Sequence, residues 1–539
     1  MKRLFLVLFL LCCWTTQADA ATYYYLDCAT GADPLCAANI GNDANTPCTN
    51  PASPCRTSSA ARTRFNSAAA GDSVLLGKCG AWSNANMVLQ NTNATASNRV
   101  TLGAYTPSWC VSGTNPILIE ARASTDLIAF DSAGADGGYV VQDLILRGSG
   151  TGQYGIFTSQ SVTDITFERL SISGFLIGVY CGQNRPRMVL RDSTIFDNSE
   201  QGTLWSCDQG SLIENNTFNN NGFVTGSGED DFHYHNVYID PQTGGVGITV
   251  RGNTLTDNSR LTNQCRSPSL VVHGQVDGLL IENNYIYQAT TTMKTGCYGI
   301  AVDTGYGGQA EYFRNAIIRG NTVVNAGNSA IGCAGCVRPV IENNVVILEQ
   351  PTGTGAMGEY FGITVPSRDP GPEDDADTGA IIRNNSVYLF WAPTDSNGIN
   401  VGEYPSGSGS DLVIASNLIF FGSGVNSNHA CFELGSRVLA NFTAFVSNLC
   451  YHLNGNGRWS TAYAALANAQ AAGFDAGGSA ADPLIAATPS SGNGWAVKVS
   501  SGSPAINGAN ATYRSRSAIK GYPALSGRDM GAYEFGSNP

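Results

Sequence analysis

The stretch Ile281-Glu282-Asn283-Asn284-Tyr285-Ile286 decides the fold, because close copies of it recur along the chain. The copies begin at Phe167, Leu190, Ile213, Val250, Ile281, Ile318, Ile341, Ile382, Ile414 and Phe445. Successive copies start 23, 23, 37, 31, 37, 23, 41, 32 and 31 residues apart, so a basal unit of 23 residues carries insertions of variable length. Such a pattern is typical of a solenoid, in which each repeat forms one coil.

Within each copy, apolar residues alternate with polar ones, as β-strands require. The fourth position is Asn in eight copies, from Asn216 to Asn448. Asn tolerates the left-handed backbone of a tight bend, and stacked side-chain amides can bond from coil to coil. A leucine-rich repeat would need Leu-x-x-Leu-x-Leu spacing and a helical segment, and the copies have neither. The sequence therefore predicts an all-β chain folded as a single-stranded right-handed parallel β-helix.

The two ends of the chain differ from the coils and predict caps, which cover the open ends of a solenoid. We expect a signal peptide over 1–20, an N-terminal cap with the first coils over 21–137, the regular coils over 138–455, and a C-terminal capping region over 456–539. Within the N-terminal cap, the patterns predict strands over 22–27 and 71–76 and a short helix over 58–70.

Composition limits the partners. A solenoid grows in one dimension, so 539 residues can form one long domain, and 63 glycines with only 13% charged residues suit a turn-rich β protein. The net charge of −13 argues against nucleic acid and anionic membranes as partners. It also weakens the attraction of an acidic polysaccharide unless a bound cation intervenes. We expect a monomer.

The first residues indicate export. Lys2 and Arg3 precede an apolar run over 4–13, and Ala18-Asp19-Ala20 matches an Ala-x-Ala cleavage site. A lipoprotein signal at Cys12 is disfavoured because Leu11 precedes it where a small residue is needed. The protein is therefore expected to be secreted or periplasmic, where disulfides persist.

Removal of the leader leaves fourteen cysteines, an even number that suits disulfides between sequence neighbours. A zinc site at Cys333 and Cys336 would need a second pair nearby, and none has the spacing. The predicted pairs are Cys28 with Cys36, Cys48 with Cys55, Cys79 with Cys110, Cys181 with Cys207, Cys265 with Cys297, Cys333 with Cys336, and Cys431 with Cys450.

A second strand pattern, x-apolar-x-apolar-x, precedes the Asn copy in each coil, and its fifth position gathers ionisable residues. In three consecutive coils this position holds Asp240, His273 and Asp303. Because stacked strands lie about 4.8 Å apart, we expect Asp240 and Asp303 to lie about 10 Å apart with His273 between them. In other coils the same position holds Ser159, Ala334, Pro366 and Gly402.

Long insertions converge on this patch, and long loops on a rigid scaffold are where such proteins place function. We interpret the acidic run 373–377 as a solvated loop. The candidate catalytic residues are Asp240, His273, Asp303 and Lys294. The candidate substrate-binding residues are His233, Tyr234, His235, Tyr238, Arg260, Arg266 and Tyr298. The candidate calcium ligands are Glu229, Asp230 and Asp231.

The Asn-turn coils from about 140 to 450 resemble the pectin-lyase-like β-helix superfamily. The endings over 502–507 and 527–535 are similar to caps of secreted bacterial β-helix proteins. The resemblance implies a carbohydrate groove along the exposed face of the strands that carry Asp240, His273 and Asp303, and hence a polysaccharide partner.

Two reactions fit these residues. In a lyase of uronate-containing glycans, calcium held by Asp230, Asp231, Asp240 or Asp303 would acidify the C5 proton, and Lys294 or an Arg would remove it. In an inverting hydrolase, Asp240 and Asp303 would be general acid and base. Asp230-Asp231 and His273-Gly274 resemble the Asp-Asp and Gly-His-Gly pieces of polygalacturonases.

A non-catalytic role is the third reading. Aromatic residues on or beside the loops, Tyr234, Tyr238, Tyr298, Tyr306, Tyr312, Tyr360 and Trp391, would suit a glycan-binding surface or an adhesin. We predict a carbohydrate-active enzyme, a lyase ahead of a hydrolase, with His273 oriented by its carboxylate neighbours.

Overall fold

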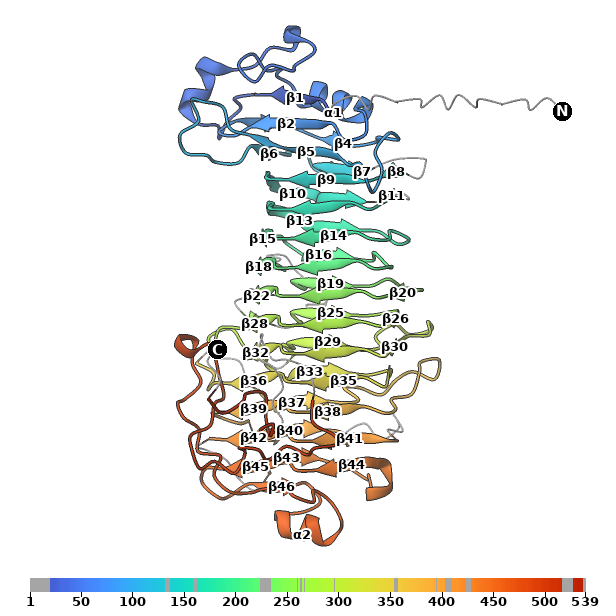
Figure 1. Cartoon of the computed structure of the whole chain (residues 1–539), viewed down its shortest axis with the longest axis vertical. Coiled ribbons are helices and arrows are strands. Elements are labelled where there is room, and N and C mark those ends of the chain that lie inside the picture. Colours follow the sequence, from blue (N-terminus) through green and yellow to red (C-terminus); the bar gives the residue numbers. More distant parts are fainter. Residues whose placement is uncertain are drawn as a thin grey trace, which may run out of the picture.

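The computed structural model describes residues 20–130, 136–158, 162–222, 234–258, 260–261, 264–265, 267–294, 296–352, 357–393, 395–402, 410–422, 428–515 and 527–536. It confirms the predicted right-handed parallel β-helix. The coils stack in one column, with α1 (Ser58–Ser67) at the N-terminal end and α2 (Leu466–Ala471) at the other (Figure 1).

Three parallel sheets run along the column. Sheet I contains β1 (Thr22–Tyr25), β2 (Ser73–Gly77), β5 (Val100–Tyr105), β9 (Tyr139–Gln142), β12 (Thr166–Glu168), β14 (Val189–Arg191), β17 (Leu212–Glu214), β21 (Thr249–Arg251), β27 (Leu280–Glu282), β31 (Ile317–Arg319), β35 (Val340–Glu342), β38 (Ile381–Arg383), β41 (Leu412–Ala415) and β44 (Phe442–Val446). Sheet II contains β3 (Ala81–Ser83), β6 (Ile117–Ile119), β10 (Ile145–Thr158), β13 (Ser171–Cys181), β15 (Thr194–Phe196), β18 (Thr217–Asn219), β22 (Thr254–Thr256), β28 (Tyr285–Tyr287), β32 (Thr322–Val324), β36 (Val345–Leu348), β39 (Ser386–Leu389), β42 (Leu418–Phe421) and β45 (Leu449–His452).

Sheet III shares the long strands β10 and β13 with sheet II, because these two strands bend across both sheets. It also contains β4 (Met87–Val88), β7 (Ile128–Phe130), β16 (Gln201–Trp205), β19 (Val237–Ile239), β25 (Leu270–Val272), β29 (Ile300–Val302), β33 (Ser329–Cys333), β37 (Glu359–Thr364), β40 (Asp395–Asn400), β43 (Ala430–Glu433) and β46 (Arg458–Ser460). Shorter strands are β8 (Asp136–Gly137), β11 (Val162–Thr163), β20 (Gly245–Val246), β23 (Arg260–Leu261), β24 (Gln264–Cys265), β26 (Gln275–Asp277), β30 (Tyr312–Arg314) and β34 (Cys336–Val337).

The Asn repeat forms the corner between sheets I and II. Asn284 Oδ1 accepts from the backbone N and from Nδ2 of Asn253, both at 3.0 Å, and Asn284 Nδ2 donates to Asn321 Oδ1 at 3.0 Å. The same bonds continue from coil to coil as far as the buried Asp475, which confirms the predicted amide ladder. The expectation that the ladder Asn takes the left-handed backbone is wrong. Asn283, one residue earlier, has φ 56°, which leaves the Asn284 amide free to point into the corner.

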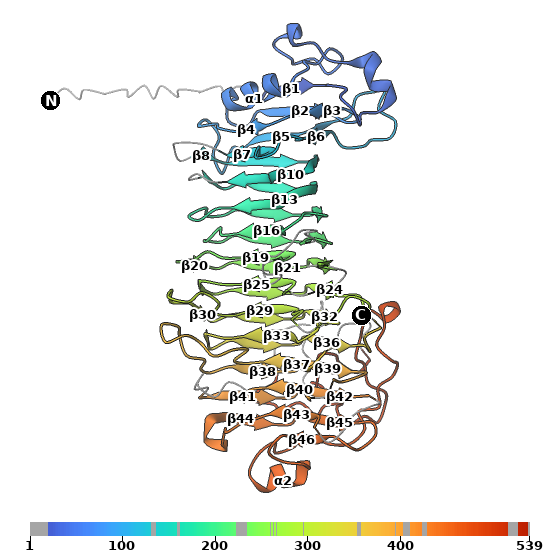
Figure 2. The ribbon, with the colours of Figure 1, turned by 180° about the vertical axis from the view of Figure 1, so that it is seen from behind.

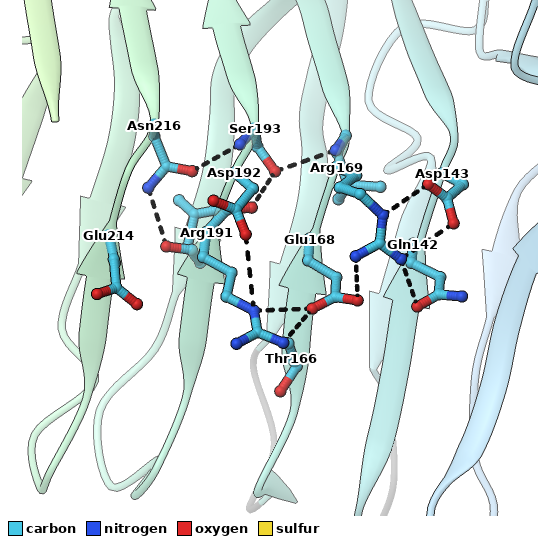
Figure 3. Close-up of polar contacts among 12 residues, drawn as sticks. Gln142, Asp143, Thr166, Glu168, Arg169, Arg191, Asp192, Ser193, Glu214 and Asn216 are labelled. Carbon is cyan, nitrogen blue, oxygen red and sulfur yellow. Dashed lines mark hydrogen bonds and ion pairs between the residues drawn. The ribbon is translucent and has the colours of Figure 1, made fainter. Parts of the chain in front are cut away.

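The outer face of sheet I carries a column of alternating charge, in which every acidic side chain has a basic neighbour on the next coil. Figure 3 shows its N-terminal part, where Arg191 Nε donates to Glu168 Oε2 at 2.7 Å. The strand register continues the column through Glu168, Arg191, Glu214, Arg251, Glu282, Arg319, Glu342 and Arg383. Opposite charges face each other only when the coils are in register, so the column disfavours slipped pairings.

The ends of the chain cover two parts of the column. Phe65 of α1 is fully buried and closes the apolar core at the first coil. Beyond α2, the C-terminal segment runs back along the outer face of sheet II (Figures 1 and 2). There Trp495 Nε1 donates to Tyr285 Oη at 3.1 Å, and Trp495, Val497 and Tyr533 pack over apolar side chains of β36, β39 and β42. Among the described apolar clusters, none covers the outer face of sheet III in this way.

All seven predicted disulfides are present in the structure. The expected strands and helix of the N-terminal cap are confirmed as β1, β2 and α1. The predicted signal peptide lies outside the described residues except for Ala20. No helix in the described part of the chain is long and apolar enough to cross a membrane.

Candidate functional site

The site lies on sheet III, where a polar residue follows each of three consecutive strands. The parallel register pairs Ile239 of β19 with Val272 of β25, and Val272 with Val302 of β29. The residues that follow these strands, Asp240, His273 and Asp303, therefore occupy equivalent positions on adjacent coils. Two coil steps separate the carboxylates, which corresponds to about 10 Å along the column.

A pocket of about 400 Å³ opens beside this column. Its walls come from β19, β25 and β29, from the loops that precede or follow these strands, and from the loop after β37, which carries Arg368. The lining residues are His235, Tyr238, Pro268, Val271, His273, Gly296, Tyr298, Ala301, Asp303, Gly305, Tyr306 and Arg368. The structure thus brings five of the predicted site residues, His235, Tyr238, His273, Tyr298 and Asp303, into one cavity.

His273 is held in one tautomer. Its Nδ1 lies 2.7 Å from the backbone carbonyl oxygen of Asp303. A carbonyl can only accept, so Nδ1 carries the proton of the neutral ring and Nε2 has the free lone pair. Nε2 has no hydrogen-bond partner among the described residues. Asp303 Oδ1 and Glu311 Oε1 lie 3.9 and 3.7 Å from Nδ1, so a positive charge on this ring would be stabilised.

Two tyrosine hydroxyls form a chain next to this ring. Tyr306 Oη donates to Asp240 Oδ2 at 3.2 Å, and the hydroxyls of Tyr238 and Tyr306 hydrogen-bond to each other. The ring centroids of Tyr238 and Tyr306 lie 5.7 and 5.1 Å from that of His273. Burial is the largest cause and raises the pKa of both hydroxyls, and the charge of Asp240 acts in the same direction. Both groups therefore keep their protons at neutral pH and can donate them.

Glu311 is a buried carboxylate that sequence reasoning missed. Its Oε1 accepts from Gly274 N at 2.6 Å, and its Oε2 accepts from Tyr306 N at 2.7 Å and from Gly305 N. It therefore ties the residue after His273 to the loop that carries Tyr306. In the sequence, Glu311 stands out only by its place in the insertion over 305–313. The insertion has no periodicity, so the contacts of Glu311 could not be predicted from it.

Arg368 is the second residue that the site adds. Its Nη2 lies 3.2 Å from Asp303 Oδ2, and its side chain is 48% exposed. Among the described residues that line the pocket, Arg368 is the one with a permanent positive charge. An exposed guanidinium at the pocket wall is suited to bind a carboxylate ligand.

The acidic run that follows Arg368 is not simply a solvated loop, and that interpretation is wrong for its last residue. Asp377 is buried and accepts from Gly335 N and Cys336 N at 3.2 and 3.0 Å, and burial raises its pKa to about 7. Asp374 Oδ1 accepts from Glu311 N at 2.8 Å. The run therefore supports the loops around the pocket.

The other predicted residues have varied positions. Lys294 precedes Gly296 and Tyr298 in the loop before β29 but is not among the residues that line the pocket. Tyr234 is buried outside the lining, and Arg260 belongs to β23. Glu229, Asp230, Asp231, His233 and Arg266 lie outside the described residues.

The described side chains around Asp240, His273 and Asp303 do not form a set of calcium ligands. Asp240, Asp303 and Glu311 are engaged by Tyr306, Arg368 and backbone N–H groups, and no three carboxylate or His ligand atoms of this patch lie within 4.8 Å of one another. Elsewhere in the described chain, Cys431, Cys450 and His452 lie within that distance, but the two cysteines are joined in a disulfide.

No protein-family model and no curated protein sequence matches the chain. Solved structures share its fold at low identity. The A-module of mannuronan C-5 epimerase AlgE4 from Azotobacter vinelandii is 16% identical, over 68% of this chain and 91% of that chain, with a TM-score of 0.45. Pectate lyase Pel9A is 13% identical, over 96% and 98%, with a TM-score of 0.38. PfbA, a surface adhesin of Streptococcus pneumoniae, is 10% identical, over 70% and 86%, with a TM-score of 0.46. The likeness concerns the fold alone.

Proposed function

We propose that this protein is a secreted or periplasmic carbohydrate-active enzyme that cleaves uronate-containing polysaccharides by β-elimination. The observation that carries the proposal is the His273 ring. Its Nδ1 is bound to the Asp303 carbonyl, which leaves Nε2 as the ring nitrogen that can act as a base, and two tyrosine hydroxyls lie beside the ring in one pocket. An elimination needs a base that removes a proton and an acid that protonates the leaving oxygen, and this arrangement offers both.

The reaction assigns one task to each group. His273 Nε2 takes the C5 proton of a uronate, and the electron pair of that C–H bond forms the C4–C5 double bond. The C4–O glycosidic bond breaks, and the leaving oxygen takes a proton from the linked hydroxyls of Tyr238 and Tyr306. The imidazolium that forms is stabilised by the carboxylates of Asp303 and Glu311.

Arg368 would bind the negatively charged carboxylate of the substrate. A uronate carboxylate placed against its guanidinium would be neutralised in part, which favours loss of the adjacent C5 proton. His235 and Tyr298 also line the pocket and would contact neighbouring sugars. Lys294 is the alternative base, and calcium ligation remains assigned to Glu229, Asp230 and Asp231.

The inverting hydrolase is less well supported by the same contacts. It needs one carboxyl group to be protonated as the general acid. Asp240 accepts from Tyr306 and from Gln242 N, and Asp303 pairs with Arg368, so the described contacts single out neither carboxyl group as the proton donor.

The test is turnover of a panel of acidic and neutral polysaccharides, with calcium or with a chelator, followed by ultraviolet absorbance and by reducing ends. The proposal expects both signals to rise on a uronate polymer such as alginate or polygalacturonate. Reducing ends without absorbance would indicate the hydrolase. No rise in absorbance or in reducing ends on any polysaccharide of the panel would indicate a binding protein.

A further inference from the structure

An aromatic cluster lies on the outer face of sheet III, N-terminal to the pocket. It consists of Tyr154 and Phe157 of β10 and Tyr180 of β13. The ring centroids of Tyr154 lie 5.1 Å from Phe157 and 5.2 Å from Tyr180, both stacked, and Phe157 lies 5.1 Å from Tyr180. All three side chains are partly exposed.

The cluster is in line with the pocket. The strand register pairs Phe157 with Tyr180, Tyr180 with Leu204, and Leu204 with Tyr238. These residues therefore form one column on the outer face of sheet III, and Figure 2 shows the strands that carry them, β10, β13, β16 and β19, stacked in this order. With about 4.8 Å for each coil, Tyr180 lies about 10 Å and Phe157 about 14 Å from Tyr238, which is itself a wall of the pocket.

A second aromatic stack in this chain serves as a comparison, because it is buried and has a packing role. Tyr388 and Phe420 on sheet II stack with centroids 4.5 Å apart, and the C-terminal segment covers them, so both are buried. Tyr154, Phe157 and Tyr180 belong to none of the apolar clusters that the described residues form. Flat rings that stay partly exposed and continue the line of a pocket are suited to bind a ligand.

We propose that Tyr154, Phe157 and Tyr180 form a remote subsite for the same polysaccharide chain that enters the pocket, and we call them the aromatic platform. The apolar C–H faces of pyranose rings would stack on Phe157 and Tyr180, while the sugar hydroxyls face water and the Tyr180 hydroxyl. A chain bound there lies along the column and directs its next residues past Leu204 to Tyr238. The enzyme therefore prefers long chains. This inference rests on the proposed function for the identity of the substrate.

The test measures binding and turnover as a function of chain length. Affinity electrophoresis in gels that contain alginate or polygalacturonate gives the dissociation constant for the polymer. The variants Tyr180→Ala and Phe157→Ala are expected to weaken binding about tenfold each. Tyr180→Phe keeps the ring and is expected to restore binding, and Phe196→Ala, which removes a partly exposed aromatic residue of sheet II, is the matched control. Thermal melts verify that each variant is folded, and Tyr180→Leu replaces any variant that is not.

With oligomers of decreasing length, the platform variants are expected to bind and cleave as well as the wild type once the oligomer is too short to extend from the pocket to the aromatic platform. Equal binding of Tyr180→Ala, Phe157→Ala and the wild type to the polymer would overturn the platform, even if elimination activity is found. Loss of retardation in the variants without any elimination product would support the platform and contradict the lyase.

Discussion

The Nδ1 atom of His273 lies 2.7 Å from the backbone carbonyl oxygen of Asp303 on the next coil. The bond uses main chain that the β-helix fixes, so the ring orientation depends on coil stacking and not on a flexible partner. It also selects the tautomer with a free Nε2.

Gly305 leaves room for the ring, and filling that room should displace it. A Cβ at Gly305 would lie 2.4 Å from His273 Cε1, which is closer than any real contact allows. We expect Gly305→Ala to lower kcat on a turned-over polymer about a hundredfold, because misplaced catalytic groups cost that much. Gly307→Ala is the control, since its Cβ would meet nothing within 4 Å. Equal loss in both variants would show that the loop, and not the ring, was disturbed.

Glu311 should matter for both stability and rate. Glu311→Gln replaces one acceptor oxygen by a donor that faces backbone N–H groups, so we expect a loss of about 3 kcal/mol in the free energy of unfolding. We also expect a fall in kcat that exceeds any change in KM, because the variant loosens the loop of Tyr306. Glu359→Gln, at an exposed glutamate, is the control for chemical denaturation and kinetics. A variant with normal kcat would limit Glu311 to a role in folding.

The charge column on sheet I gives a salt-dependent prediction. Arg251→Glu places a carboxylate between Glu214 and Glu282 on the neighbouring coils. Because these side chains are partly exposed, we expect a destabilisation of only about 1 kcal/mol at low salt, and less at about 1 M salt. Thermal melts of Arg251→Glu and Arg251→Gln at both salt concentrations measure the effect. A loss that does not depend on salt would assign it to packing of the Arg251 stem.

Asp475, the last acceptor of the Asn ladder, gives a pH prediction. Burial raises its pKa from 3.8 to about 6. The folded protein therefore binds this proton more tightly than the unfolded chain, and the associated stability is present below about pH 4 and lost as pH rises to 6. The difference corresponds to about 3 kcal/mol. Asp475→Asn lacks this titration, so its stability relative to the wild type should rise between pH 4 and 6. A constant difference across that range in urea unfolding would contradict the assignment.

The repeat made the fold predictable. The Asn copies mark one corner of each coil, and counting from them aligned Asp240, His273 and Asp303 correctly. Disulfides between neighbouring coils followed from the same one-dimensional order. The contacts of Glu311, Tyr306 and Arg368 could not be predicted, because insertions follow no period and meet in space from different coils. The left-handed residue was placed one position late, since Asn tolerates that backbone and stands at both corner positions in four copies, where the side-chain bonds distinguish the two roles.

The central claim is that His273 is the base of an elimination. It is tested most directly by the rate at which purified His273→Gln forms unsaturated uronate, measured by absorbance on the polysaccharide that the wild type cleaves best. We expect a rate about 10² to 10⁴ times lower than that of the wild type, with an unchanged melting profile. A rate within about threefold of the wild type from a folded variant would contradict it and leave Lys294 as the base to examine.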